Sequence, residues 1–372
     1  MRDSWPVVRV GYTLEQCWHR VPGGTATSAL GTAAALQQRE DIELVGVAAR
    51  HRGDPPAPWT PPIPVRHLPL PRQALYECWH ALRWPRVQRA TGNLDVIHAT
   101  GMAIPPRSAP LVVTVHDLAF LRYPDHATRH GQRFFKRSLE LTRRDADLVL
   151  CPSEATRRDC LAYGFDGERV RVVPWGIDVA SAASPLDATA RVERLGLGGT
   201  RFVLWVGTVE PRKNLRTLLD AFARLEQRNV TLVLAGQEGW NEDIGPRVAR
   251  LEPRVRMLGF VNNDDLRALY AYAAVFCYPS LLEGFGLPVL EAMAAGTAVL
   301  TSEGTATEEV VGDAGVVVDP HDPIALADAL AALLDDDDRR AKLGHAARDR
   351  AATFTWERTA AQTAAAYKEV AR

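Results

Sequence analysis

The chain is poor in cysteine and has no long apolar run. Its five cysteines among 372 residues are scattered and odd in number: Cys17, Cys78, Cys151, Cys160 and Cys277. This spacing indicates neither a disulfide framework nor a metal cluster, so we expect a reducing compartment, the cytoplasm. No apolar stretch approaches the ~20 residues that span a bilayer, and the first residues run into a predicted strand without a signal-peptide core.

Net charge is also nearly absent, at −1, but the charges are unevenly distributed. Residues 1–177 hold 23 Lys and Arg against 17 Asp and Glu, a net charge of +6, and the remainder holds 21 against 28, a net charge of −7. A basic half favours an anionic partner, either a membrane surface or a phosphorylated acceptor, although surface composition alone explains it equally well. We therefore leave open a peripheral contact with the inner face of a membrane, and we expect no nucleic-acid partner.

The rest of the composition is that of a globular protein with two domains. At 372 residues, 47% apolar and 24% charged, the chain is long for one domain and comfortable for two. In its first part, short β-branched runs alternate with helical periodicity, which predicts βαβ units and a parallel sheet. The predicted strands are residues 7–10, 42–49, 95–99, 111–115, 146–151 and 170–174, and the predicted helices are residues 26–38, 73–90, 129–144 and 154–163.

Two segments interrupt this alternation. Residues 53–71 hold eight prolines and are predicted to form a surface loop. Residues 179–200 are rich in Ala, Ser and Gly and are predicted to be a linker with a short helix. The alternation then restarts, which predicts a second doubly wound α/β domain. Its predicted strands are residues 202–206, 230–235, 255–260, 274–278, 298–301 and 315–318, with helices at 215–226, 264–271, from 288 onward, 323–334, 337–352 and 354–370.

The stretch Leu281–Gly296, LLEGFGLPVLEAMAAG, joins a short glycine-containing loop to a helix that we expect to begin at Pro288. Proline suits a first helical turn, and the two glycines before it let the backbone approach a ligand closely. The unpaired N–H groups and partial positive charge of a helix start favour a phosphate. Glu283 and Glu291 border this position, where their carboxylates could accept hydrogen bonds from sugar hydroxyls.

The same stretch also has an ordinary structural interpretation. Val289, Leu290, Met293 and Ala294 lie at helical spacing and are predicted core residues. An acidic residue in a first turn often only complements the helix dipole. Two glutamates eight residues apart carry little information in a chain with 45 acidic residues. The functional interpretation therefore depends on the whole string.

Polar residues follow three further predicted elements. In VVTVHDL, His116 lies at the carboxyl end of a strand, where open α/β sheets bind ligands, although a lone histidine is usually structural. In VGTVEPRKN, Arg212 and Lys213 lie on a strand-to-helix turn and could neutralise a diphosphate, Arg by forked hydrogen bonds and Lys as a compact charge. The pair Gly23-Gly24 precedes the first predicted helix and by itself indicates only a turn.

Taken in order along the chain, these segments resemble the retaining, nucleotide-sugar-dependent glycosyltransferases of family 4, which have the GT-B fold. The resemblance rests on the Glu-x7-Glu string, on VVTVHDL, on VGTVEPRKN and on PWGID at residues 174–178, which matches the family's domain boundary. It implies two Rossmann-like domains facing a central cleft. Residues 1–177 would bind the acceptor and residues 178–352 the donor, and residues 353–372 would form a helix that crosses back to the first domain.

The resemblance also implies roles for single residues. His116, Glu283, Lys213 and Arg212 match the positions that act on the donor sugar and its diphosphate. The implied donor-binding positions are Gly24, Gly207, Thr208, Arg212, Lys213, Val261, Gly284, Phe285, Gly286, Leu287 and Glu291. The resemblance implies no metal and no cofactor besides the nucleotide-diphosphate sugar, which is a co-substrate. It further implies attack on the same face as departure, with a diphosphate oxygen taking the acceptor proton.

Donor and acceptor remain open at this point. VHDLAFLRYPD and VGTVEPRKN look most like members that use GDP-mannose or a similar hexose donor, and UDP-glucose or UDP-N-acetylglucosamine is the alternative. The acceptor is a glycan, a lipid-linked sugar or a small molecule. Two other hypotheses are a sugar-nucleotide epimerase or phosphorylase of the same fold, and a catalytically silent nucleotide-sugar-binding subunit. The Glu-x7-Glu string and the missing pyridoxal-lysine motif disfavour the first, and the presence of His116, Lys213 and Glu283 disfavours the second.

Overall fold

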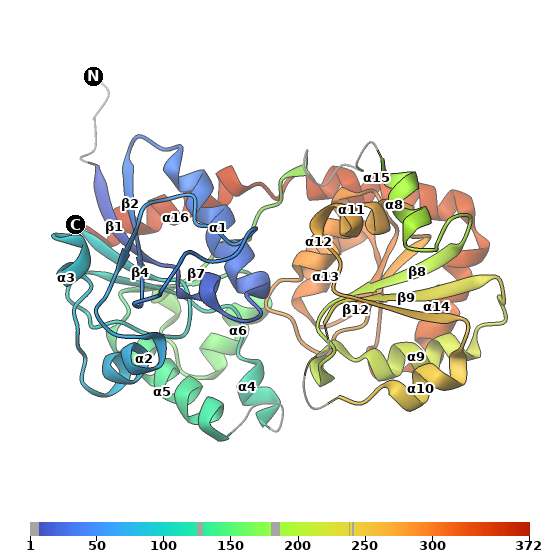
Figure 1. The fold of residues 1–372 in the computed structure, drawn as a ribbon, viewed down its shortest axis with the longest axis horizontal. Coiled ribbons are helices and arrows are strands. Elements are labelled where there is room, and N and C mark those ends of the chain that lie inside the picture. The colour runs from blue at the N-terminus through green and yellow to red at the C-terminus, as the bar shows by residue number, and fades with distance from the viewer. Residues whose placement is uncertain (1–6, 125–128, 180–186, 238, 240–241) are drawn as a thin grey trace. The chain divides into compact units, whose positions relative to one another are not determined.

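The computed structural model describes residues 7–124, 129–179, 187–237, 239 and 242–372 of the chain (Figure 1). The chain divides into two compact units, which are described separately. Unit 1 comprises Met1–Gly176 and Thr355–Arg372, and unit 2 comprises Ile177–Phe354. Unit 1 is therefore built from two separate pieces of chain, with its second piece contributed by the C-terminal residues.

Unit 1 contains a seven-stranded sheet in the order β3-β2-β1-β4-β5-β6-β7, in which every pair of neighbours is parallel. The parallel arrangement places the carboxyl ends of all strands at one edge, where ligands bind in open α/β sheets. The strands are β1 (Val8–Thr13), β2 (Ile42–Ala48), β3 (Val65–His67), β4 (Val96–Ala99), β5 (Leu111–Thr114), β6 (Leu148–Cys151) and β7 (Val170–Val172).

Helices cover both faces of this sheet, because neighbouring residues on a strand point to opposite faces. Ile97 and Val113 belong to one buried cluster, and the preceding residues Val96 and Val112 belong to the other. Helices α2 and α5 lie on one side of the sheet and α1 and α16 on the other (Figure 1). The helices of unit 1 are α1 (Gly23–Gln37), α2 (Arg72–Ala81), α3 (Gln88–Thr91), α4 (Ala119–Arg122), α5 (Arg129–Asp145), α6 (Glu154–Ala162) and α16 (Trp356–Val370), with the short helices η1 (Glu15–Trp18) and η3 (Gly167–Arg169).

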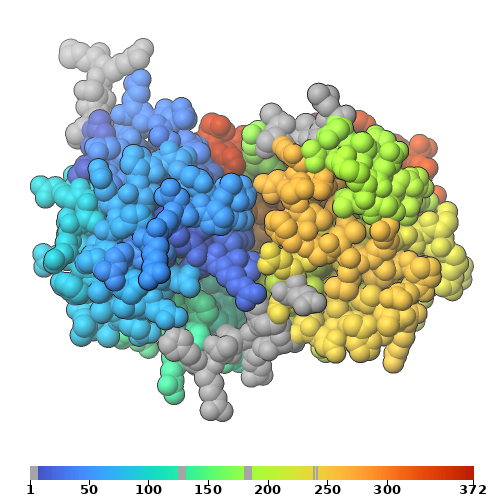
Figure 2. Space-filling model, in the orientation of Figure 1, coloured from blue at the N-terminus to red at the C-terminus, as the bar shows by residue number. Residues whose placement is uncertain are grey.

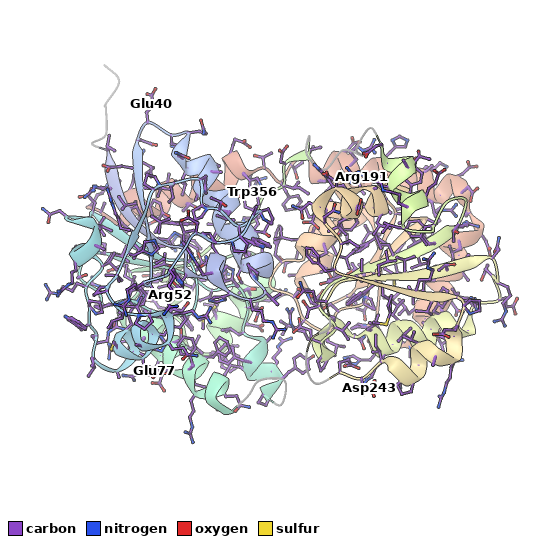
Figure 3. All side chains as sticks on the ribbon, viewed as in Figure 1. Glu40, Arg52, Glu77, Arg191, Asp243 and Trp356 are labelled. Carbon is purple, nitrogen blue, oxygen red and sulfur yellow. The ribbon has the colours of Figure 1, made fainter. Side chains whose placement is uncertain are left out.

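The C-terminal helix α16 is an integral part of unit 1. Trp356, labelled in Figure 3, packs so closely on α1 that a Cβ atom on Gly31 would lie 2.4 Å from its indole. Further along α16, the hydroxyl of Tyr367 lies 2.6 Å from Nδ1 of His98 on β4, and both side chains are buried. Unit 1 is thus completed by a helix that lies almost 200 residues after its last strand, as Arg171 on β7 and Glu369 on α16 are 198 positions apart and form an ion pair.

Unit 2 contains a six-stranded parallel sheet in the order β10-β9-β8-β11-β12-β13. The strands are β8 (Arg201–Val206), β9 (Val230–Ala235), β10 (Val255–Gly259), β11 (Val275–Tyr278), β12 (Val299–Ser302) and β13 (Val316–Val318). The helices are α8 (Ala188–Arg194), α9 (Leu215–Arg224), α10 (Gly245–Leu251), α11 (Asn263–Tyr272), α12 (Leu287–Ala294), α13 (Ala306–Val311), α14 (Pro323–Asp335) and α15 (Asp337–Ala351), with η4 (Pro211–Lys213) and η5 (Gly312–Ala314). Together the two sheets confirm the predicted pair of doubly wound, Rossmann-like domains.

The structure differs from the prediction in the proline-rich part of unit 1. Residues 53–71 contain the edge strand β3, because prolines flank but do not enter it and an edge strand tolerates them. The helix expected at residues 73–90 is two helices, α2 and α3. Arg83 adopts φ 54° and Pro85 follows it, and both interrupt helical hydrogen bonding. This part of the chain forms much of the visible surface of unit 1 (Figure 2, light blue).

Two helix starts also differ from the prediction. The Gly23-Gly24 pair, expected as a turn before the helix, forms the first two residues of α1. Helix α12 begins at Leu287, one residue before the expected Pro288. In the ranges that the structure describes, no helix is both long and apolar enough to cross a membrane.

Candidate active site

The strand order of unit 2 reverses between β8 and β11, which are hydrogen-bonded neighbours. At such a switch point the chains leaving the two strands diverge, and the crevice between them is where open α/β sheets bind ligands. The segment after β8 leads into η4, and the segment after β11 leads into α12. The backbone N–H of Leu281 donates to the carbonyl of Arg212 at 2.8 Å, which joins the two segments.

Arg212 and Lys213 on η4 both contact the carboxylate of Glu283. Nζ of Lys213 lies 2.6 Å from Oε1 of Glu283, and Nη1 of Arg212 lies 3.2 Å from Oε2. The Lys213 and Glu283 side chains are 9% and 8% exposed, so this ion pair is shielded from water. A second carboxylate, Glu210, lies 2.8 Å from Nη2 of Arg212. Three residues that the sequence predicted separately are thus brought together in one buried cluster.

The charges in this cluster shift the pKa values of its members. Burial raises the pKa of Glu283, but the neighbouring charges of Lys213 and Arg212 outweigh it and hold the pKa at about 2. Burial lowers the pKa of Lys213, as does the charge of Arg212, while Glu283 opposes both. Glu283 therefore stays ionised at neutral pH and fixes two cations at the switch point.

Three residues that sequence reasoning did not select hold this cluster in place. Ser280 donates to Oε1 of Glu283 at 2.7 Å, and Nζ of Lys213 donates to the hydroxyl of Tyr278. Asn214, at φ 55°, donates to the carbonyls of Pro279 and Pro320 at 2.9 and 2.6 Å. Because a left-handed conformation is uncommon outside glycine, Asn214 combines a sharp turn with this cross-link. Of these three residues, only Ser280, a polar residue two positions after the end of β11, resembles the strand-end residues that the sequence analysis selected.

Helix α12 starts at the end of the same segment. Gly286 precedes it at φ 105°, and a Cβ atom there would lie 2.6 Å from Cγ2 of Thr307, so only glycine fits. Phe285 is buried with its ring edge-on to Phe354 at 5.9 Å, and Leu287 is buried as the first residue of the helix. The predicted donor-binding residues from Gly284 to Leu287 therefore form the approach to a helix start beside the Glu283 cluster.

Glu291, the second carboxylate of the stretch, lies one turn further along α12. It accepts a hydrogen bond of 2.9 Å from the hydroxyl of Tyr270 on α11. Burial raises the pKa of Glu291 to about 7, and the Tyr270 hydrogen bond limits the rise. Glu291 is thus close to half protonated at neutral pH, in contrast to Glu283. Tyr270 is a further residue that sequence reasoning missed, since it precedes Glu291 by 21 positions.

The other predicted residues of unit 2 follow the neighbouring strands. Gly207 and Thr208 leave β8, and the N–H of Gly207 donates to the carbonyl of Ala235 at 3.0 Å. Val261 lies two residues after the end of β10 and is partly exposed. All three positions lie at the carboxyl edge of the sheet, as the Arg212 and Glu283 segments do.

Two predicted residues belong to unit 1. Gly24 is in the first turn of α1. His116 follows β5 and is 9% exposed, and its Nε2 donates to the carbonyl of Thr100 at 2.7 Å. Its Nδ1 is buried and, among the described residues, has no hydrogen-bond partner. A cavity of about 20 Å³, the size of one water molecule, adjoins His116 and Trp175. His116 therefore offers one unused acceptor, with its tautomer fixed by Thr100.

No group of three or more His, Cys, Asp or Glu side chains within the described ranges is placed to hold a metal ion. The cations at the switch point are protein side chains, Arg212 and Lys213, and the arrangement can bind and neutralise an anion with fixed charges. Preorganised cations of this kind stabilise charge that develops on a leaving group.

Comparison with known proteins agrees with this geometry. The family described as Glycosyltransferase Family 4 matches residues 22–181, and the family described as Glycosyl transferases group 1 matches residues 189–350. The O-antigen chain mannosyltransferase B of Escherichia coli is 34% identical over 282 residues, which cover 73% of this chain and 74% of that protein. A D-inositol 3-phosphate glycosyltransferase of Xylanimonas cellulosilytica is 31% identical over 387 residues, covering 94% and 92%.

The fold is also similar to that of solved structures. A crystal structure of Anabaena HepE in complex with UDP and glucose superposes with a TM-score of 0.79 at 22% identity, covering 97% of this chain and 100% of that one. The two Rossmann-like units and this likeness define the GT-B fold, and the family models and relatives identify a glycosyltransferase. The chain belongs to glycosyltransferase family 4, and glycosyl transfer is its activity.

Proposed function

We propose that the chain is a retaining hexosyltransferase that moves mannose from GDP-mannose to an acceptor without a metal ion. The observation that carries this proposal is the cluster at the switch point of unit 2. There Glu283 holds Lys213 at 2.6 Å and Arg212 at 3.2 Å beside the start of α12. A nucleoside diphosphate is the ligand that two fixed cations and a helix start suit best.

The chemistry follows from the charges. When the bond between the anomeric carbon and the diphosphate oxygen breaks, its electron pair goes to that oxygen and the sugar becomes oxocarbenium-like. Arg212, Lys213 and the amides of Gly286 and Leu287 stabilise the growing negative charge on the diphosphate. The acceptor hydroxyl attacks on the face that the diphosphate leaves, so the anomeric configuration is retained. The proton of that hydroxyl passes to the departing diphosphate oxygen.

Two carboxylates and one histidine orient the donor in this proposal. Glu283, ionised because its pKa is about 2, accepts hydrogen bonds from hydroxyls of the donor sugar. Glu291 accepts from the ribose hydroxyls of the nucleotide. His116 contacts the donor sugar, with its ring oriented by the hydrogen bond from Nε2 to the carbonyl of Thr100.

Mannose is the proposed sugar because a relative of 34% identity is named as a mannosyltransferase and because VHDLAFLRYPD resembles GDP-mannose-dependent members. A UDP-sugar donor is the second candidate, and the HepE structure that was crystallised with UDP and glucose favours it. The two relatives are named for different acceptors, an O-antigen chain and a phosphorylated inositol. Their names therefore leave both a glycan and a small-molecule acceptor within the proposal.

Donor hydrolysis in the absence of acceptor tests the proposal. The chain is incubated with radiolabelled GDP-mannose, UDP-glucose and UDP-N-acetylglucosamine, and release of free sugar is measured. We expect GDP-mannose to be hydrolysed fastest and Lys213→Ala to reduce that rate by about 10²–10³-fold, the size typical for loss of one preorganised charge-stabilising group. Lys342→Ala removes an exposed lysine of the same unit and should leave the rate unchanged.

Three results would contradict parts of the proposal. A preference for a UDP-sugar would replace the donor and leave the site assignment in place. Equal rates for Lys213→Ala and Lys342→Ala would remove the site assignment. Release of the sugar with inverted anomeric configuration, measured by proton NMR immediately after the reaction, would remove the retaining mechanism.

A further inference from the structure

Unit 1 contains a pocket of about 690 Å³ to which neither the sequence motifs nor the candidate site assigns a ligand. It lies between the segment after η1, the first turns of α2, and α5, which packs beside α2 (Figure 1). Its volume is within the range of about 300–1,000 Å³ that is usual for small-molecule sites. The segment after η1 follows β1, and α2 and α5 follow β3 and β5 along the chain.

One wall of the pocket is aromatic. The ring of Tyr76 on α2 stacks on the ring of Phe134 on α5, with centroids 5.7 Å apart and planes inclined by 24°. Phe134 also stacks on His80, with centroids 4.5 Å apart and planes inclined by 18°, which fixes the orientation of its ring. A flat apolar wall of this kind suits the carbon–hydrogen face of a sugar or polyol ring, since small-molecule sites combine aromatic walls with a few placed polar groups.

Two guanidinium groups, those of Arg20 and Arg72, also line the pocket. Arg72 is partly buried, and its one described hydrogen bond is a long one, 3.4 Å from Nη1 to the carbonyl of Trp18. In the ranges that the structure describes, neither Arg72 nor Arg20 forms an ion pair, whereas Arg83 and Arg107 of the same unit are each paired with an aspartate. A guanidinium with unused forked donors at a pocket wall is suited to a phosphate.

Nearby polar groups can bind hydroxyls. Burial, and then the charges of Arg72 and His51, lower the pKa of His19 to about 4, so its imidazole is neutral and offers one donor and one acceptor. Its Nε2 lies 3.4 Å from the hydroxyl of Tyr76. The amide of Gln73 and the carboxylate of Glu77 also line the pocket, and Glu77 is labelled in Figure 3. With two arginines against one glutamate, the lining has a net positive charge.

We propose that this pocket binds a sugar or polyol monophosphate, with the ring against Tyr76 and Phe134 and the phosphate on Arg72 and Arg20. This inference rests on the proposed function in one respect, namely that the bound monophosphate is the acceptor of glycosyl transfer. The excess of basic residues in the first half of the chain then has a local role, because Arg20 and Arg72, which form no ion pair with any described residue, face a ligand site.

Binding is tested first, by calorimetry on the full chain. The probes are mannose 6-phosphate, glucose 6-phosphate, glucose 1-phosphate, the parent hexoses, glucuronic acid and inorganic phosphate. We expect at least one hexose phosphate to bind about tenfold more tightly than its parent hexose, glucuronic acid or inorganic phosphate, because ring and phosphate are both held. Equal affinity for glucuronic acid, or no binding of any hexose phosphate, would overturn the assignment.

Variants then locate the site. Arg72→Ala should weaken hexose phosphate binding by about tenfold or more, and Arg72→Lys should recover part of it because the charge returns without the fork. Arg86→Ala removes an exposed arginine of unit 1 outside the pocket and should leave binding within about twofold. Equal affinities of Arg72→Ala and wild type would overturn the proposal. Thermal unfolding of each variant checks that the fold is retained.

Nucleotide binding and transfer separate this inference from the proposed function. Arg72→Ala should bind GDP and hydrolyse the donor as the wild type does, while its KM for the hexose phosphate acceptor rises about tenfold. Transfer to neutral hexoses as efficient as transfer to hexose phosphates would overturn this inference and leave the proposed function standing. Hexose phosphate binding without transfer, in an enzyme that hydrolyses its donor, would overturn the acceptor role.

The same chemistry can be offered by a free sugar phosphate or by a phosphorylated lipid headgroup. Vesicles of phosphatidylcholine with and without phosphatidylinositol distinguish the two in a flotation assay. Binding of phosphatidylinositol vesicles that hexose phosphate displaces, and that Arg72→Ala abolishes, assigns the pocket to a headgroup. Binding of free hexose phosphate without vesicle binding assigns it to a soluble acceptor. Absence of both contradicts the proposal.

Discussion

Glu283 and Glu291 belong to one short stretch of sequence, yet their surroundings act on them in opposite directions. Glu283 lies against Lys213 and Arg212, and these charges hold its pKa at about 2 despite its burial. Among the described residues, Glu291 is hydrogen-bonded to one neutral group, the hydroxyl of Tyr270, and burial raises its pKa to about 7. The difference between two cations and one phenol therefore separates the pKa values of two identical side chains by about five units.

This difference indicates separate tasks. A carboxylate that is ionised at every physiological pH can fix the positions of the two cations that we propose to bind the diphosphate. A carboxylate that titrates near neutral pH can gain or lose a proton when a nucleotide arrives, so its contribution to binding depends on pH. Three substitutions break or sharpen this comparison, in decreasing order of expected effect.

Glu283→Gln should have the largest effect. The change leaves Lys213 and Arg212 without the carboxylate that fixes them, and removal of one partner of a buried ion pair costs about 3–5 kcal/mol. We therefore expect a free energy of unfolding lower by about that amount, measured in urea at pH 7, together with loss of most donor hydrolysis. Glu303→Gln, an exposed glutamate of unit 2, is the matched control and should change neither quantity.

The ion pair between Glu283 and its two cations also predicts how the stability of the wild type depends on acid pH. The pKa of Glu283 is lowered from 4.5 in the unfolded chain to about 2. Its contribution to stability is therefore fully present above pH 4.5 and is lost as the pH falls through 2. Glu283→Gln should lack this part of the acid dependence, and an unchanged acid profile in the variant would contradict the pairing.

Glu291→Gln should have an intermediate effect, visible mainly in pH dependence. The pKa of Glu291 is raised from 4.5 to about 7, so between these values the folded chain keeps a proton that the unfolded chain has released. Its contribution is present below pH 4.5 and is lost as the pH rises through 7, which lowers the free energy of unfolding by about 3 kcal/mol across that window. Glu291→Gln should flatten this slope.

The pH dependence of nucleotide affinity tests the proposed binding role of Glu291. Ionised Glu291 accepts hydrogen bonds from ribose hydroxyls better than the protonated form, so GDP should bind more tightly as the pH rises through about 7. Calorimetric titrations from about pH 5.5 to 8.5 cover the transition. An affinity that is flat in the wild type, or that rises equally in Glu291→Gln, would assign the titration to another group.

Tyr270→Phe should have the smallest effect. The Tyr270 hydroxyl stabilises the ionised form of Glu291, so its removal raises the pKa of Glu291 further and moves the inflection of GDP affinity to higher pH. The loss in stability should be about 1 kcal/mol, the net worth of one hydrogen bond. Tyr272→Phe on the same helix, where the tyrosine is 45% exposed, should leave the inflection where it is.

The sequence predicted the architecture well, for a physical reason. Buried parallel strands are short β-branched runs between helices, and β9 has the predicted bounds Val230–Ala235. The prediction failed where an element is too short to show a hydrophobic pattern, or where a single residue ends it. The strand Val65–His67 has three residues between prolines, and α2 ends where Arg83 takes a left-handed conformation that no periodicity reveals.

The candidate site was predicted only in part. Glu283, Arg212 and Lys213 stand out as charged residues at strand ends, and the structure brings them together. Tyr278 and Tyr270 could not be selected, because an aromatic residue in a strand or helix is usually core and their polar contacts depend on tertiary packing. The pocket of Arg72 and Phe134 was also beyond prediction, since it joins helices that are about 60 residues apart in sequence.

Helix α16 has a consequence for synthesis on the ribosome. Because its Trp356 fills the space above Gly31 and its Tyr367 bonds to His98, the first unit cannot close its interior until the final residues emerge. The intervening unit, Ile177–Phe354, is contiguous and can fold beforehand. Nascent chains that stall before Trp356 would therefore display an ordered second unit tethered to an incomplete first unit, and quality-control proteases should cleave the latter.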